Sequence, residues 1–351
     1  MDKPKKLKMN AKTFRIITAP IMVLFLIFAL ALSIITNYFT PSLNAFLGKG
    51  ARKATTPSGT SDWDTDYYDI TSTSSEDALN NSLKTSENIA DEGIVLLKNN
   101  GLLPLATEQT VTPFGYDYLN PMMSGSGSGS ADTTADYVYT AEKGINEAFS
   151  NVNSASVDAM KNGTVHETTP AAASGEGGAT AFLGSSTILN EYPAETYNGI
   201  EDSCKGTVGI VFLGRAGGEG GDLYAEAYDD GTPHQLALTD TERGVLDFAK
   251  KNCAGVVVVL NSCNTMQVGE LEDDPDIDAV ITMCTPGAVG FKSLGKILNG
   301  TVNPSGKTVD TFVADCTLTP TYVNFNKGDG ATSYSNASYT RDIWLSKFKG
   351  G

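Results

Sequence analysis

Three continuous apolar runs in the second half of the chain constrain its fold more than any other feature. They are "GTVGIVFLG" (206–214), "AGVVVVLN" (254–261) and "IDAVITMC" (277–284). A strand that faces water on one side alternates apolar and polar residues, whereas these runs do not, so both faces of each strand must be covered. Amphipathic segments separate the runs. The pattern predicts an α/β fold, a layered sandwich with a largely parallel sheet flanked by helices.

Two helices between and after these strands have recognisable ends. In "LTDTERGVLDFAKKN" (238–252), Thr239 and Glu242 have the spacing of a capping box, in which each side chain bonds the backbone of the other. In "GAVGFKSLGKILNG" (287–300), Gly300 is expected to close the helix.

The preceding part of the domain is expected to add one helix and one strand. The helix covers "SEDALNNSLKTSENIADEGIVLLKNN" (75–100), with a cap at Ser75 and an end at the "NNG" that follows. The strand is "TVTPFGY" (110–116). Residues 150–200 are rich in Ala, Ser, Gly and Thr and favour no element.

The N-terminus predicts a membrane-spanning helix. The 21 residues from Ile16 to Thr36 carry no charge, and at about 1.5 Å per residue they cover a hydrocarbon core of roughly 30 Å. Six cationic residues precede them, which favours a cytoplasmic N-terminus and an extracellular remainder in a single-pass protein of the cell membrane. A cleaved signal peptide is the alternative, but its apolar stretch is shorter and a small-residue cleavage site follows it.

These features divide the chain into five predicted parts. A cytoplasmic basic segment (1–15) precedes the transmembrane helix, and a Ser-, Thr- and Gly-rich linker precedes the sandwich domain. The other predicted boundaries are 16–37 for the transmembrane helix, 38–75 for the linker, 76–318 for the domain and 319–351 for a polar tail or the start of a following domain.

Composition narrows the classes of partner and cofactor. The chain has 25 basic and 41 acidic residues, a formal charge of −16, so a basic patch for nucleic acid is not expected. The five cysteines are widely spaced and are interpreted as small buried residues, and the two histidines, His166 and His234, as ordinary loop residues. We therefore expect no metal site and no cofactor.

One loop could bring a carboxyl group to a ligand. In "GRAGGEGGDLYAEAYDDG" (214–231), Glu219 stands among closely spaced glycines, which permit close approach of a ligand. The loop follows a predicted parallel strand, and ligands of such sheets gather at the carboxyl ends of the strands. A lone loop glutamate usually only faces solvent. Cleavage of a glycosidic bond, however, needs two carboxyl groups, one of which donates a proton to the leaving oxygen.

Other ligand motifs do not fit. A dinucleotide-binding glycine motif that starts at Gly218 would need glycine at 223, where the chain has Leu223. In "GTVNPSGKT" (300–308) the glycine spacing is one residue too long for a phosphate-binding P-loop, so a structural turn is preferred. A serine hydrolase would need a G-x-S-x-G turn with a partner histidine, which the chain lacks.

Several stretches, taken in order, resemble the C-terminal α/β-sandwich domain of glycoside hydrolase family 3, the β-glucosidase and β-xylosidase family. They span residues 76–315. The stretches are "ENIADEGIVLLKNNGLLPL" (87–105), "FGYDYLNPMMSGSGSGS" (114–130), "GGEGGDL" (217–223), "VVVVLNSCNTMQV" (256–268) and "TPGAVGFKSLGKILNGTVNPSGKTVDTF" (285–312).

The resemblance implies a retaining, exo-acting glycosidase that acts on oligosaccharides or β-glycosides. Glu219 matches the general acid/base of that family, and Asp222, with Gly218 and Gly220, is expected to contact the substrate. Leu223 stands where the family often has arginine.

The family's nucleophile is an aspartate on a separate (β/α)8 barrel, and the 351 residues contain no eightfold βα pattern. Ser61-Asp62-Trp63 looks like the nucleophile motif but follows no apolar strand, so we interpret it as a coincidence. The leading hypothesis is a membrane-anchored acid/base domain that needs a barrel, on this or another chain. The alternative is a non-catalytic, membrane-anchored module that binds carbohydrate or acts as a scaffold.

Overall fold

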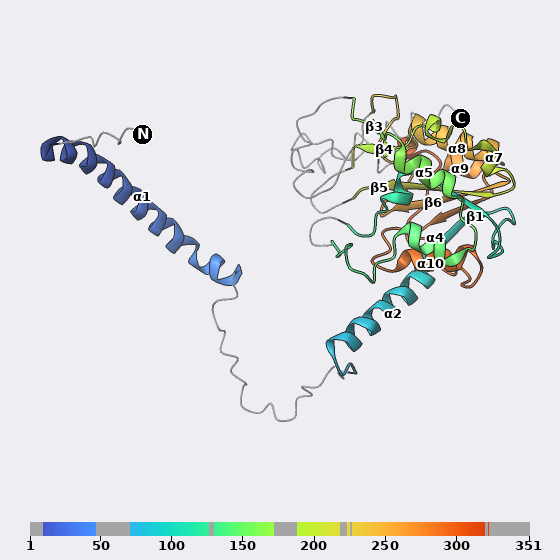
Figure 1. Cartoon of the computed structure of the whole chain (residues 1–351), viewed down its shortest axis with the longest axis horizontal. Helices are drawn as coiled ribbons and strands as arrows, with labels where there is room; N and C mark the ends of the chain where they lie inside the picture. The colour runs from blue at the N-terminus through green and yellow to red at the C-terminus, as the bar shows by residue number, and fades with distance from the viewer. Residues whose placement is uncertain are drawn as a thin grey trace, which may run out of the picture. The chain divides into compact units, whose positions relative to one another are not determined.

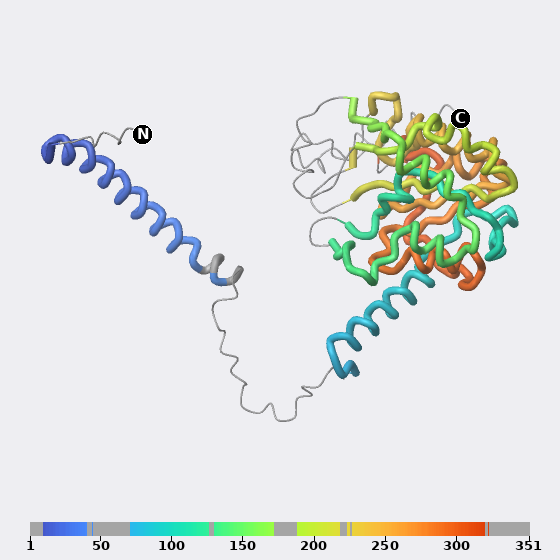
Figure 2. The backbone as a smooth tube through the Cα atoms, viewed as in Figure 1, coloured from blue at the N-terminus to red at the C-terminus, as the bar shows by residue number. Residues whose placement is uncertain are grey.

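The chain forms two compact units, Met1–Ile70 and Thr71–Gly351 (Figures 1 and 2). The computed structural model describes residues 10–46, 71–125, 130–171, 188–217, 223–224, 227–319 and 322.

In the first unit the described residues form one helix, α1 (Ala11–Phe46). Within its stretch Ala11–Thr40 an 18-residue window has a mean hydropathy of 2.6, and the stretch is long and apolar enough to cross a membrane, as a membrane anchor or a signal sequence would be. The helix continues past residue 37, the predicted end of the span. Ser61, Asp62 and Trp63 lie outside the described residues.

The core of the second unit is a five-stranded sheet. Its strands lie in the order β1-β7-β6-β5-β2, where β2, β5, β6 and β7 pair in parallel and β1 pairs with β7 antiparallel. This largely parallel sheet confirms the predicted fold class. The bounds are β1 (Val95–Asn99), β2 (Val111–Phe114), β5 (Val208–Arg215), β6 (Gly255–Ser262) and β7 (Ala279–Thr282).

The apolar runs form the central strands because they are covered on both sides. β5 pairs with β6 from Val208↔Gly255 to Arg215↔Ser262, and every residue of β6 is buried. Four consecutive valines in β6 suit this position, since β-branched side chains pack well on a pleated surface.

Helices cover the sheet in two groups (Figure 1). α5, α7 and α8 pack together with a short 3-10 turn, η2, while α2 and α4 both pack against α10. The bounds are α2 (Ser75–Gly93), α3 (Tyr116–Leu119), α4 (Ala141–Ala148), α5 (Ser154–Asn162), η2 (Ala194–Tyr197), α7 (Glu201–Cys204), α8 (Asp240–Asn252), α9 (Gly269–Asp273), α10 (Gly290–Leu298) and η3 (Cys316–Leu318). A two-stranded antiparallel sheet pairs β3 (His166–Thr168) with β4 (Leu189–Glu191).

The predicted helix ends of α8 and α10 are confirmed. Thr239 caps α8 and forms a capping box with Glu242, and Gly300 follows α10 with a φ of +77°. Where α4 crosses α10 the backbones touch, because a Cβ atom at Gly144 would lie 2.2 Å from the carbonyl oxygen of Phe291.

The prediction of one helix over 75–100 is wrong beyond Gly93. The helix α2 ends there, and Val95–Asn99 form the edge strand β1. Glycine weakens a helix, and pairing with β7 outweighs the helical pattern of the following residues. The N-cap is Ser74, whose side chain accepts a hydrogen bond from the Asp77 amide, rather than Ser75.

The interpretation of all cysteines as buried is also wrong. Cys204 is buried, but Cys263 and Cys284 are exposed, because they follow β6 and β7 at the carboxyl edge of the sheet. Cys284 has a φ of 50°, an unusual value for a residue other than glycine.

Candidate functional site at the carboxyl edge of the sheet

The loops after the parallel strands meet at one edge of the sheet. The buried side chain of Asn261, near the end of β6, joins two of them: its Oδ1 atom accepts the Met122 amide at 2.7 Å, and its Nδ2 atom donates to the carbonyl oxygens of Met122 at 2.8 Å and Cys284 at 2.6 Å. This amide therefore fixes the loops after β2 and β7 to β6 itself.

The predicted acid/base segment, residues 216–223, starts at this edge because it directly follows β5. Gly217, two residues after the end of β5, lies next to the loop after β6, because a Cβ atom there would be 3.3 Å from Asn264 Nδ2. Gly125, from the loop after β2, lies beside Gly217 as well. The four predicted site residues themselves, Gly218, Glu219, Gly220 and Asp222, lie outside the described residues.

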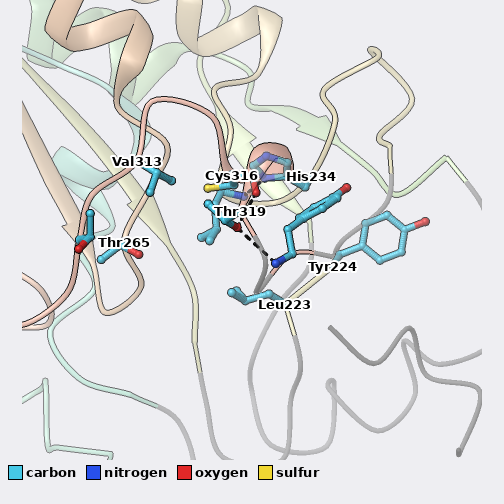
Figure 3. A pocket seen from close by; sticks show the side chains of 10 residues that line it. Leu223, Tyr224, His234, Thr265, Val313, Cys316 and Thr319 are labelled. Carbon is cyan, nitrogen blue, oxygen red and sulfur yellow. Dashed lines mark hydrogen bonds between the residues drawn. The ribbon is translucent and has the colours of Figure 1, made fainter. Parts of the chain in front are cut away.

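A cavity of about 240 Å³ adjoins the same segment (Figure 3). Apolar side chains form much of its wall, and they come from the segment after Asp222 and from the last described residues of the chain. The lining residues are Leu223, Tyr224, His234, Leu236, Thr265, Thr311, Val313, Cys316, Thr319 and Tyr322. Leu223, which lines this cavity, is four residues after Glu219 in the sequence.

His234 is a buried, neutral residue of this wall rather than an ordinary loop histidine. Its Nδ1 atom accepts the Leu236 amide at 3.2 Å, so the proton lies on Nε2, which is 3.2 Å from Gln267 Oε1. Burial lowers the pKa of His234, against the opposing effect of the Gln267 bond. The other histidine, His166, is exposed in β3.

Arg215, the last residue of β5, is the largest fully buried side chain of the described residues. Its guanidinium has five N–H donors, and all five are used. Nε donates to the Gln235 carbonyl at 2.5 Å, and one donor each reaches the carbonyls of Gly214 at 2.7 Å and Ala237 at 2.6 Å. The remaining two hold the Glu242 carboxylate at 2.6 and 2.8 Å.

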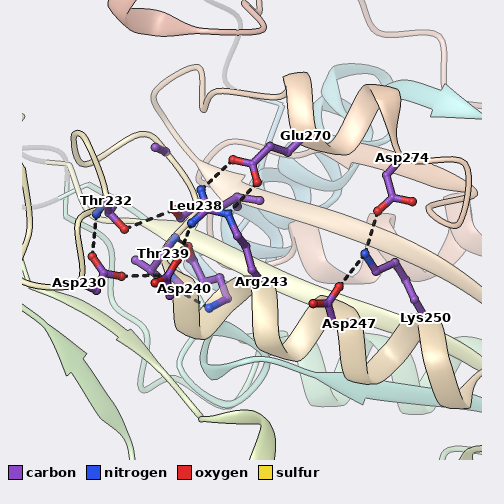
Figure 4. Close-up of polar contacts among 12 residues, drawn as sticks. Asp230, Thr232, Leu238, Thr239, Asp240, Arg243, Asp247, Lys250, Glu270 and Asp274 are labelled. Carbon is purple, nitrogen blue, oxygen red and sulfur yellow. Dashed lines mark hydrogen bonds and ion pairs between the residues drawn. The ribbon is translucent and has the colours of Figure 1, made fainter.

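Glu242 connects this arginine to the start of α8. Besides the two bonds from Arg215, its Oε2 atom accepts the amide of the N-cap residue Thr239 at 2.7 Å. Just outside the helix, Asp230 accepts the amides of Thr232 at 2.9 Å and Asp240 at 3.0 Å (Figure 4). Several hydrogen bonds therefore hold the residues that precede α8, from Asp230 to Thr239.

Two further buried carboxyls lie near this ion pair. Burial raises the pKa of Asp117 to about 7; the positive charge of Arg215 opposes this, and the negative charge of Glu242 adds to it. The Gly214 amide donates to Asp117. Burial likewise holds the pKa of Glu191 well above its usual range. The Arg215 guanidinium thus forms an ion pair with Glu242 and acts on Asp117 as well, while burial favours the protonated form of Asp117 and Glu191.

The sequence analysis did not find Arg215, Asp117, Glu191 or Asn261. Glu242 was identified only as a capping residue. One signal was present, since Arg215 ends an otherwise apolar strand and a charge at such a position must be paired. Among the residues that the structure describes, no group of three His, Cys, Asp or Glu side chains is arranged to hold a metal ion.

Comparisons with known proteins agree with the family resemblance. A family model described as the glycosyl hydrolase family 3 C-terminal domain matches residues 94–347. A β-glucosidase from Ruminococcus albus is 29% identical over 71% of this chain and 25% of its own length. β-Glucosidase A from Butyrivibrio fibrisolvens is 26% identical over 73% of this chain and 31% of its own length. The chain therefore spans about a quarter to a third of these relatives.

Solved structures give the same result for the fold. A β-glucosidase from Paenibacillus barengoltzii matches with a TM-score of 0.55 and 25% identity, over 70% of this chain and 25% of that one. β-Glucosidase 3B from Thermotoga neapolitana, solved with α-D-glucose, matches with a TM-score of 0.55 and 21% identity, over 71% of this chain and 33% of that one.

Proposed function

Because the chain belongs to glycoside hydrolase family 3, to whose C-terminal domain residues 94–347 match, we propose that it supplies the acid/base domain of a retaining, exo-acting β-glycosidase of the β-glucosidase type. Its substrates are short oligosaccharides or other β-glycosides, cleaved at the non-reducing end. The observation that carries this proposal is the family match across the segment with Glu219, which follows the carboxyl end of β5.

In this mechanism Glu219 acts twice. As an acid it protonates the glycosidic oxygen while a second carboxylate attacks the anomeric carbon, and as a base it then takes a proton from the water that hydrolyses the glycosyl-enzyme. Asp222, Gly218 and Gly220 contact the sugar. The close approach of Gly217 to the loops after β2 and β6 supports a binding role for this edge.

The second carboxylate belongs to a (β/α)8 barrel, in the same protein or on another chain. Retention requires the two carboxyl groups to lie about 5 to 5.5 Å apart, so the barrel must face the loop at the carboxyl edge. The relatives, which are three to four times longer than their match to this chain, support such a partner.

We place the catalytic domain outside the cell. Residues 16–37 of α1 span the cell membrane, residues 1–15 remain in the cytoplasm, and residues 38–75 connect the span to the domain at 76–318, with a tail or further domain from 319. The apolar stretch Ala11–Thr40 and the cationic residues that precede its centre support this topology.

The test is hydrolysis of aryl β-glucosides by the full-length protein that contains this chain, with Glu219→Gln beside its parent. A general acid matters most when the leaving group is poor. We expect kcat/KM for phenyl β-glucoside to fall about a hundredfold to ten-thousandfold, with a much smaller loss for dinitrophenyl β-glucoside.

Glu226→Gln is the matched control, since it changes another glutamate of the stretch 214–231 that the family motif does not include. It should retain the parent's rates on both substrates. If Glu219→Gln keeps full activity on phenyl β-glucoside, or if the parent, assayed together with the barrel chain where the barrel is separate, hydrolyses neither substrate, the catalytic proposal is wrong and a carbohydrate-binding or scaffolding module replaces it.

A further inference from the structure

A short segment of the chain, residues 216–223, follows β5 and contains Glu219. Both ends of this segment are bound to one buried residue, Gln235. Arg215 donates from Nε to the Gln235 carbonyl, and Tyr224 makes two bonds with Gln235: its amide donates to Oε1 at 2.8 Å and its carbonyl accepts the Gln235 amide at 2.9 Å. The two residues that flank the segment, Arg215 and Tyr224, are thus hydrogen-bonded to the same residue, which we call the anchor.

The anchor is itself fixed to the fold by the guanidinium of Arg215. Arg215 is 1% exposed and Gln235 is 2% exposed, so water does not compete for their bonds. The same guanidinium holds Ala237 and the Glu242 carboxylate, and Glu242 belongs to the first turn of α8. We call Arg215, Gln235 and Glu242 the brace.

The brace constrains where a carboxyl group on the segment can lie. Glu219 is four residues from Arg215 and five from Tyr224, and four extended residues span at most about 14 Å. Fixing both flanking residues therefore limits the positions that Glu219 can reach. General acid catalysis depends on such placement, because a displacement of about 1 Å can lower a rate by about a hundredfold.

We propose that Arg215, Gln235 and Glu242 are positioning residues that set the location of Glu219 for proton transfer to the glycosidic oxygen. They touch neither the substrate nor the reacting atoms. The inference rests on the proposed function, in which Glu219 is the acid/base, and extends it to the residues that make the segment competent.

Arg215→Lys tests the brace in the full-length protein. A lysine ammonium retains the charge but cannot hold the carboxylate with two parallel bonds and reach the carbonyls as well. We expect kcat/KM for phenyl β-glucoside to fall by about tenfold to a hundredfold, with less than about a threefold loss for dinitrophenyl β-glucoside. Partial unfolding would lower both rates equally, so this difference reports on acid placement.

Two further variants make the result decisive (Figure 4). Arg243→Lys is the matched control, since Arg243 lies next to Glu242 and also forms a two-bond pair, with Glu270 at 2.7 and 2.8 Å, but joins α8 to α9 instead of to the segment. It should leave both rates unchanged. If Arg215→Lys does not fold, Gln235→Met takes its place, because it removes the Oε1 acceptor of Tyr224 and keeps the backbone bonds of Gln235 to Arg215 and Tyr224.

Equal losses on the two substrates, or no loss, in the brace variants would overturn the inference. If at the same time Glu219→Gln shows the selective loss, the proposed function stands without the brace. If Glu219→Gln itself shows no selective loss, the proposed function fails and the inference fails with it.

Discussion

At the scale of single residues, the main feature is a concentration of buried charge at the end of β5, the strand that precedes the predicted acid/base segment. One arginine forms a saturated set of hydrogen bonds, and its carboxylate partner Glu242 is shared with the N-terminus of a helix. Breaking a buried pair leaves an uncompensated charge that costs about 3 to 5 kcal/mol. The pair is therefore strong evidence for a defined geometry here and weak evidence for extra stability.

Asp117 should make the stability of the domain depend on pH. Its pKa of about 7 in the folded chain is well above the value of about 3.9 for an unfolded aspartate. The folded chain thus holds a proton that the unfolded chain loses, and this contribution to stability declines as the pH rises from about 4 to about 7.

The variant Asp117→Asn cannot ionise but keeps an oxygen for the Gly214 amide. The unfolding free energy of the variant should rise relative to that of the parent as the pH rises from about 4 to about 7, by up to about 4 kcal/mol. Thermal unfolding of the parent and the variant at a series of pH values measures this difference. A constant difference, or one that shrinks with rising pH, would show that Asp117 is not the group responsible.

At the scale of secondary-structure elements, the sequence predicted what depends on local pattern. The runs that became β5, β6 and β7 are continuous and apolar, and the ends of α8 and α10 have capping residues. β1 was missed because its residues continue the helical period of α2, and only pairing with β7, far away in sequence, makes them a strand.

Only the place of the candidate site in the fold can be compared with the sequence. The family resemblance predicts Glu219 as the acid/base, and the apolar run that forms β5 predicts the edge at which its segment starts. The brace could not be predicted, because Arg215, Gln235 and Glu242 come together only when the chain returns from that edge to α8. Asn261 was missed for the same reason, since all its partners lie in other loops.

At the scale of the whole molecule, we propose a membrane anchor followed by a catalytic domain. Deletion of residues 1–40 should move the protein from the membrane pellet to the soluble fraction without loss of its activity on aryl β-glucosides, because the apolar stretch Ala11–Thr40 belongs to a separate compact unit. Fractionation of cells that express each form measures this. If cells that express the undeleted chain instead yield a shortened, soluble protein, the stretch is a cleaved signal sequence.

The central claim is that this domain supplies the acid/base of a retaining glycosidase. In Glu219→Ala the water that hydrolyses the glycosyl-enzyme has no base, whereas azide is an anion that needs none. The most direct measurement is therefore hydrolysis of dinitrophenyl β-glucoside by the full-length Glu219→Ala variant with and without sodium azide. We expect azide to raise the rate and the product to be β-glucosyl azide. A rate that azide does not change, or an azide product of the α configuration, would contradict the central claim.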